Sequence, residues 1–131
     1  MRQLVALLLI AALSTTAAAQ VRVATGGVGV EERAALEGDD AYNLKVVSAL
    51  ATGQYLADVH VRIVDAAGTQ VAEARTDGPW LLAALPPGRY RIIATFRGIS
   101  QTRDFTAGAG RHEIVLHWDA AAAGDRAVLV R

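Results

Sequence analysis

Apolar and polar residues alternate with a period of two through most of this chain, and this alternation limits the folds open to it. The pattern is clearest over residues 59–63, 90–96 and 114–118. Successive side chains of a strand point to opposite faces, so each segment predicts a strand with one apolar and one polar face. Turn signals rich in glycine, proline and aspartate separate the segments, and long helical patterns are absent. This spacing is typical of an antiparallel sandwich or barrel and unlike a βαβ fold.

The first 19 residues have the pattern of a cleaved signal peptide. Arg2 precedes an apolar run over residues 4–13, which is shorter than the roughly 20 residues that a membrane-spanning helix needs. A polar break and three alanines follow, and such small residues suit a signal peptidase. We expect cleavage between Ala19 and Gln20, and so a periplasmic or secreted protein without stable membrane insertion. The alternative is an uncleaved N-terminal anchor.

The remaining chain divides into three segments. Residues 20–41 predict a flexible, glycine-rich N-terminal segment with a short helix over residues 30–37, whose acidic start and following Gly38 suit helix ends. Residues 42–118 contain the alternating strands and are expected to form the sandwich. Residues 119–131 form an alanine-rich C-terminal tail.

Composition argues against several kinds of partner and chemistry. The chain has 13 basic and 13 acidic residues, so it has no net charge that would attract nucleic acid over a distance. It has no cysteine, which excludes disulfides, a thiol nucleophile, cysteine-ligated metals and a lipid anchor on cysteine. An exported chain of this kind depends on its apolar core alone.

Residues 77–92, Asp-Gly-Pro-Trp-Leu-Leu-Ala-Ala-Leu-Pro-Pro-Gly-Arg-Tyr-Arg-Ile, resemble the core signature of carboxypeptidase regulatory-like domains. The resemblance extends over residues 42–118, and related surface and starch-binding-like modules share its Pro-Pro-Gly-x-Tyr element. It implies a transthyretin-like fold, a seven-stranded antiparallel Greek-key β-sandwich. It also implies a module that presents a surface and performs no catalysis. Gly78 and Gly88 permit the turns, and Tyr90 can bury its ring while its hydroxyl meets a backbone group.

Candidate sites for chemistry are weak. The glycines of residues 25–29 do not form a dinucleotide fingerprint, because Glu32 stands where glycine is needed and acidic side chains oppose a phosphate. His60, His112 and His117 lack the spacing of metal ligands, so neither a metal nor a cofactor is expected. No Gly-x-Ser-x-Gly elbow occurs, and the C-terminal Tyr-Arg-Gly-Ser of the transthyretin-like 5-hydroxyisourate hydrolases is missing. We expect no catalytic residue; an unrecognised hydrolase is the less favoured alternative.

The strongest candidate for a binding surface is a row of arginines. Arg89, Arg91 and Arg97 alternate with the apolar face of one predicted strand, and Arg103 falls on its expected hairpin neighbour. These four side chains predict a basic stripe on one sheet surface, which is either an ordinary solvated face or a contact for an acidic partner. Trp80 and Trp118 are expected in the core rather than on a carbohydrate-stacking platform.

Two non-catalytic functions follow from these patterns. The first is an envelope module that binds a protein or glycan partner. The second is a structural or assembly protein that pairs with its partner through an edge strand.

Overall fold

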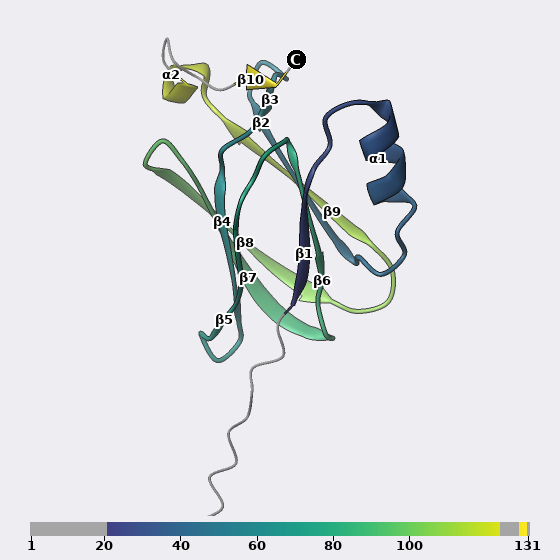
Figure 1. Cartoon of the computed structure of the whole chain (residues 1–131). Coiled ribbons are helices and arrows are strands. Elements are labelled where there is room, and N and C mark those ends of the chain that lie inside the picture. The colour runs from purple at the N-terminus through teal and green to yellow at the C-terminus, as the bar shows by residue number, and fades with distance from the viewer. Residues whose placement is uncertain (1–20, 124–128, 131) are drawn as a thin grey trace, which may run out of the picture.

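The computed structural model describes residues 21–123 and 129–130. The expected signal peptide and the cleavage site between Ala19 and Gln20 lie outside these residues. The described chain is mostly β-strand and forms two sheets, with helix α1 (Val30–Glu37) beside one of them (Figure 1). The all-β, two-sheet class that the alternating pattern predicts is therefore confirmed.

The larger sheet has six strands within the described chain and is built around β2. Strand β2 pairs antiparallel with β6 and parallel with β9, while β1 extends the sheet beyond β6. The short strand β3 pairs with the end of β2 and with β10. The strands are β1 (Arg22–Gly26), β2 (Leu44–Leu50), β3 (Tyr55–Leu56), β6 (Trp80–Ala84), β9 (His112–Trp118) and β10 (Leu129–Val130).

The smaller sheet has four antiparallel strands in the order β5-β4-β7-β8. A register irregularity separates Ile63 from Val64 where β4 meets β5. Arg97 and Gly98 join β7 to β8 with φ of 48° and 80°, the left-handed pair that a two-residue hairpin turn requires. The strands are β4 (His60–Asp65), β5 (Gln70–Arg75), β7 (Gly88–Phe96) and β8 (Ile99–Ala107).

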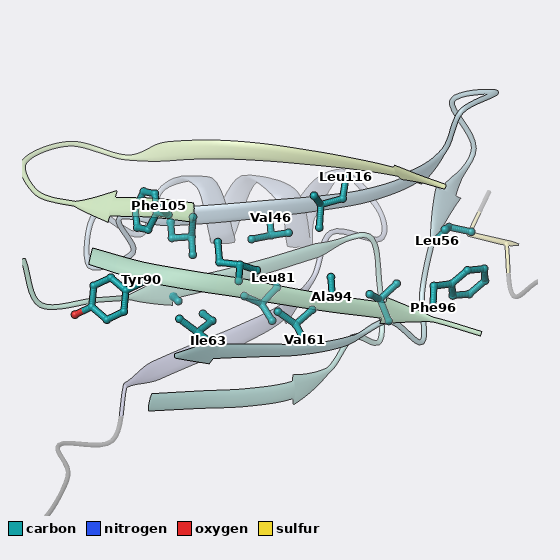
Figure 2. Close-up of a cluster of buried hydrophobic side chains, with 14 of the residues drawn as sticks. Val46, Leu56, Val61, Ile63, Leu81, Tyr90, Ala94, Phe96, Phe105 and Leu116 are labelled. Atoms are coloured by element: carbon teal, nitrogen blue, oxygen red, sulfur yellow. The ribbon is translucent and has the colours of Figure 1, made fainter. Parts of the chain in front are cut away.

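One apolar core lies between the two sheets (Figure 2). The three segments with the clearest alternation all turn their apolar side chains into it, as predicted, and the core includes Trp118. Tyr90 buries its ring at one end, and its hydroxyl donates a 2.6 Å hydrogen bond to the carbonyl of Pro86. The fully buried side chains with the largest volumes are Trp118, Phe96, Leu44, Leu56, Ile63, Leu81, Leu82, Ile92 and Leu116.

Strand β2 departs from the predicted pattern. The alternation predicts that Lys45 faces solvent, but every residue of β2 is buried. The reason is a second apolar cluster on the outer face of the larger sheet, in which Tyr42, Val47, Trp80 and Leu82 pack with Leu36 of α1. Because α1 covers the outer face of the sheet over β2, and the core covers the inner face, β2 has no solvated face.

The N-terminal segment, expected to be flexible, contributes to the larger sheet. Strand β1 pairs with β6 over five residues, and helix α1 has the bounds that the sequence predicts. At Gly27, between them, a β-carbon would lie 2.7 Å from two ring carbons of Trp80, so the chain passes too close for a side chain. Tyr42, the expected start of the sandwich, is thus preceded by one further strand of it. The alanine-rich tail contains helix α2 (Ala120–Ala123) and β10.

Candidate partner-contact surface

The outward side of the four-stranded sheet, here called the open face, is a sheet surface that the described chain leaves uncovered. In contrast to the larger sheet, no helix packs on it (Figure 1). Its side chains alternate with the core residues of the same strands and are exposed or half-buried. They come from all four strands and include His60, Arg62, Glu73, Arg75, Arg89, Arg91, Ile93, Thr95, Ser100, Thr102, Asp104 and Thr106.

The structure brings together only part of the predicted arginine stripe. Arg89 and Arg91 lie together on the open face, near one end of β7. Arg97 lies in the turn at the other end of the same strand. Arg103 pairs in register with Ile92, a core residue, so its side chain points to the opposite side of the sheet. Arg103 is nevertheless exposed, because β8 is the edge strand.

Arg62 also lies on the open face, although the predicted arginine stripe did not include it. It lies at the centre of β4, opposite Ile93 of β7 and Glu73 of β5, and it is exposed. Its alternation with Val61 and Ile63 already predicts an outward position. What the sequence could not supply was the strand order β5-β4-β7-β8, which places β4 beside β7.

A shallow groove of about 550 Å³ lies at the end of the open face that contains Arg89 and Arg91. Asp65 at the end of β4 and the turn that follows it form one wall, and Asp104 of β8 lies opposite. Arg91 donates a 3.1 Å hydrogen bond to Asp104, so part of the positive charge is neutralised within the groove. Burial raises the pKa of Tyr90, and the nearby Asp65 carboxylate adds to this, so the phenol in the groove stays neutral.

Positive charge is concentrated on the four-stranded sheet. Its strands and the turn after β7 carry six arginines against three acidic residues, a net charge of +3. The rest of residues 21–123 carries four basic and nine acidic residues, a net charge of −5. Within the described chain, Arg62, Arg89 and Arg97 take part in no ion pair, whereas Arg75 and Arg91 each contact an aspartate. The chain is neutral overall, but its charges are segregated.

A row of polar side chains crosses the other end of the open face. Nε2 of His60 lies 2.5 Å from a carboxylate oxygen of Glu73, and the pKa of Glu73 is lowered by this hydrogen bond and by one from Gln70. Thr95 pairs in register with His60 on one side and with Ser100 on the other, and the two hydroxyls lie 2.7 Å apart. Thr95 therefore lies between His60 and Ser100, the only histidine and the only serine of this row. Across residues 21–123 and 129–130, no group of three or more His, Asp or Glu residues is placed to hold a metal ion.

Polar contacts also fasten α1 to the larger sheet. The ammonium group of Lys45 lies 2.9 Å from a carboxylate oxygen of Glu37 and 3.5 Å from the ring centroid of Trp80. The hydrogen bond and charge of Lys45 lower the pKa of Glu37. Arg111 donates to three carbonyls in and after α1, those of Glu37 at 2.9 Å, Asp39 at 2.5 Å and Tyr42 at 3.0 Å.

Trp80 and Trp118 are both buried, which confirms the expectation that neither forms an exposed stacking platform.

Comparison with known proteins assigns no family to this chain, so a function can be argued only from the geometry of the site. No family model matches the chain, and no curated protein matches it. None of the described helices is long and apolar enough to cross a membrane.

Proposed function

We propose that this chain is a non-catalytic binding module that contacts an acidic protein or glycan partner through the open face. The observation that carries the proposal is that Arg62 and Arg89 on the open face, and Arg97 in the turn beside it, form no ion pair within the described chain. Arg62 lies opposite Glu73, and its charge contributes only the smallest of the effects that lower the pKa of that carboxyl. A guanidinium group binds carboxylate or phosphate oxygens through paired hydrogen bonds, and the sheet fixes the backbone positions of the arginines that carry these groups.

The spacing of these groups favours an extended partner over a small ligand. Arg89 and Arg97 belong to one strand and its turn, eight positions apart. At about 3.3 Å per residue, their backbones are separated by roughly 26 Å. A partner that engages both arginines must carry several negative charges along a chain or a surface, as an acidic polypeptide or an acidic polysaccharide does.

The transthyretin-like, seven-stranded Greek-key fold is part of the proposal. It is supported by the pairing of β2, which is antiparallel to β6 and parallel to β9, and by the second sheet in the order β5-β4-β7-β8. The seven sandwich strands are then β2 and β4 to β9, and β1, β3 and β10 are additions. The hydrogen bond from Tyr90 to Pro86 gives the Pro-Pro-Gly-x-Tyr element a folding role.

Export to the periplasm is proposed from the sequence pattern of the first 19 residues. The direct test is N-terminal sequencing of the protein recovered from the periplasm of a Gram-negative host. A chain that begins at Gln20 supports the proposal, and a chain that retains Met1 in the membrane fraction contradicts it.

Binding to two soluble polyanions tests the contact surface. Polyglutamate represents an acidic polypeptide and polygalacturonate an acidic glycan, while dextran is the neutral control. We expect calorimetric binding to one polyanion at low salt that weakens as salt is added, because exposed charges are screened. The variant Arg62→Gln/Arg89→Gln should lose at least about tenfold in affinity, equivalent to about 1.4 kcal/mol.

The matched control is Arg22→Gln, which removes an exposed guanidinium group from β1, outside the open face. This variant should bind as the wild type does. The assignment to the open face is wrong if Arg22→Gln weakens binding as much as the double variant. The acidic-partner proposal itself fails if neither polyanion binds.

A further inference from the structure

The edge strand β8 is the longest uninterrupted edge of the two sheets within the described chain. It pairs with β7 over nine residues without a register shift, and the described chain places no strand on its other side. An edge of this kind presents a row of backbone N–H and C=O groups that can accept another strand. The opposite edge, β5, is shorter, adjoins a register irregularity and lies close to β1 of the other sheet.

The turn between β7 and β8 determines which backbone groups of β8 face outward. In a two-residue hairpin the residues that flank the turn, here Phe96 and Ile99, form a hydrogen-bonded pair, and such pairs then alternate along the ladder. Consequently Ser100, Thr102, Asp104 and Thr106 direct their N–H and C=O groups away from β7. In agreement, the carbonyl of Thr102 accepts a 3.0 Å hydrogen bond from the guanidinium group of Arg103.

We propose that two copies of this chain pair through β8, antiparallel about a twofold axis at Thr102. In this register Thr102 faces Thr102 of the second copy, and Ser100 faces Asp104 of the second copy. The three outward-facing pairs supply six backbone hydrogen bonds, two for each pair. The two four-stranded sheets become one eight-stranded sheet. This inference is independent of the acidic partner, although pairing would join the two open faces into one surface.

Side-chain complementarity selects this register over its neighbours. On the core-facing side, Ile99, which is 48% exposed in the single chain, comes opposite the buried Phe105, whose ring would extend the apolar contact across the pair. Gln101 comes opposite Arg103, and the 3.3 Å hydrogen bond from Arg103 to Gln101 within the single chain can then form between the two copies. An axis at Arg103 would instead place two guanidinium groups directly opposite each other, and an axis at Asp104 would oppose two carboxylates. Like charges in directly opposed positions destabilise a strand pair.

The same complementarity points to a second copy of the chain rather than to an unrelated strand. Every position from Ile99 to Phe105 finds a compatible residue in its own sequence read in reverse about Thr102. On the open face, Ser100 meets the carboxylate of Asp104 and the two Thr102 hydroxyls meet each other. Paired threonines and paired polar groups stabilise neighbouring strands.

Cysteine cross-linking tests the register directly, because the chain contains no other cysteine. In Thr102→Cys, the Cα atoms of the two opposed residues would lie about 5.5 Å apart, which a disulfide can span. In the matched variant Ser100→Cys, the two cysteines would be offset by four residues, about 14 Å, which is too far. Under mild oxidation we expect Thr102→Cys to form a covalent dimer and Ser100→Cys to remain mostly unlinked.

Sedimentation equilibrium tests the pairing without cross-linking. The wild-type protein should show a concentration-dependent mass that rises to twice that of the monomer. Thr102→Lys places two ammonium groups opposite each other and should raise the dissociation constant at least about tenfold. Ser100→Lys places a lysine opposite Asp104 and should leave the dimer intact. Circular dichroism must show that each variant keeps the wild-type spectrum, as expected for substitutions at exposed edge positions.

Three results would overturn the proposal. A wild-type protein that stays monomeric at several hundred micromolar has no such dimer. Equal cross-linking by the two cysteine variants places the axis elsewhere. A dimer that Thr102→Lys and Ser100→Lys weaken equally does not use this register. Should Thr102→Lys lose the wild-type spectrum, the two cysteine variants still decide the question.

Discussion

Arg111 offers the sharpest test of what holds helix α1 and the connection after it against the larger sheet. This residue follows the turn after β8, yet its guanidinium group donates to the carbonyls of Glu37, Asp39 and Tyr42, which belong to α1 and the connection to β2. It therefore fastens two parts of the chain that are about 70 residues apart in sequence. The variant Arg111→Ala removes all three donors and leaves their acceptors in place.

The magnitude follows from how well each acceptor is shielded from water. A hydrogen bond from a charged donor contributes about 1.5–3 kcal/mol when it is shielded. The bond to Glu37 is exposed and is counted as zero, whereas those to Asp39 and Tyr42 are partly buried. At the lower value, Arg111→Ala should cost about 3 kcal/mol of unfolding free energy. Arg111→Lys, which keeps the charge and one bond, should cost about half as much.

Urea unfolding followed by tryptophan fluorescence measures these values. The two variants should show the wild-type dependence on urea and a lower midpoint, because the same surface is exposed on unfolding. The control Arg62→Ala removes an exposed arginine without an ion pair and should change the stability by less than about 0.5 kcal/mol. The reasoning is refuted if Arg111→Ala is as stable as this control.

Two further predictions concern α1 and the segment before it. Because Lys45 lowers the pKa of Glu37 below its ordinary value of 4.5, this contribution to stability is present above that pH and is lost as the pH falls through the lower, folded pKa. Urea midpoints measured from pH 6 to pH 3 should therefore fall less steeply for Glu37→Gln than for the wild type, and parallel slopes would contradict this. Gly27→Ala should lower the unfolding free energy by about 2 kcal/mol, because φ is +92° and the methyl group would meet Trp80. Gly108→Ala, where a β-carbon meets open space, should change thermal stability little; equal effects would contradict the contact.

The strands of the core could be predicted because their burial is a local property of the sequence. In β4, β7 and β9 the alternation of apolar and polar residues matches the observed inward and outward positions. Helix α1 was also predictable with its bounds, since glycines flank it and acidic residues begin it. In each case the residues that determine the element lie within the element or beside it.

Two features that the prediction missed depend on how separate elements are brought together. Lys45 alternates with apolar residues as a solvent-facing residue would, and only the packing of α1 over β2 makes it buried. The face on which Arg103 lies depends on the length of the turn before it. With Arg97 and Gly98 both in the turn, Arg103 comes into register with Ile92 and points to the core side. A change of one residue in the turn would reverse this outcome.

The parallel pairing of β2 with β9 has a consequence for the order in which the molecule can be completed. About 60 residues separate these neighbouring strands, and everything between them must be synthesised before β9 can take its place. Until then β2 has a vacant side, and the interior lacks Leu116 and Trp118. Closing so long a loop costs chain entropy before the contacts between β2 and β9 can form and offset it. Chains rich in such long-range contacts therefore fold slowly. A nascent chain interrupted before residue 112 would therefore expose apolar residues of the incomplete core. It would be prone to aggregate unless another molecule bound it until synthesis resumed.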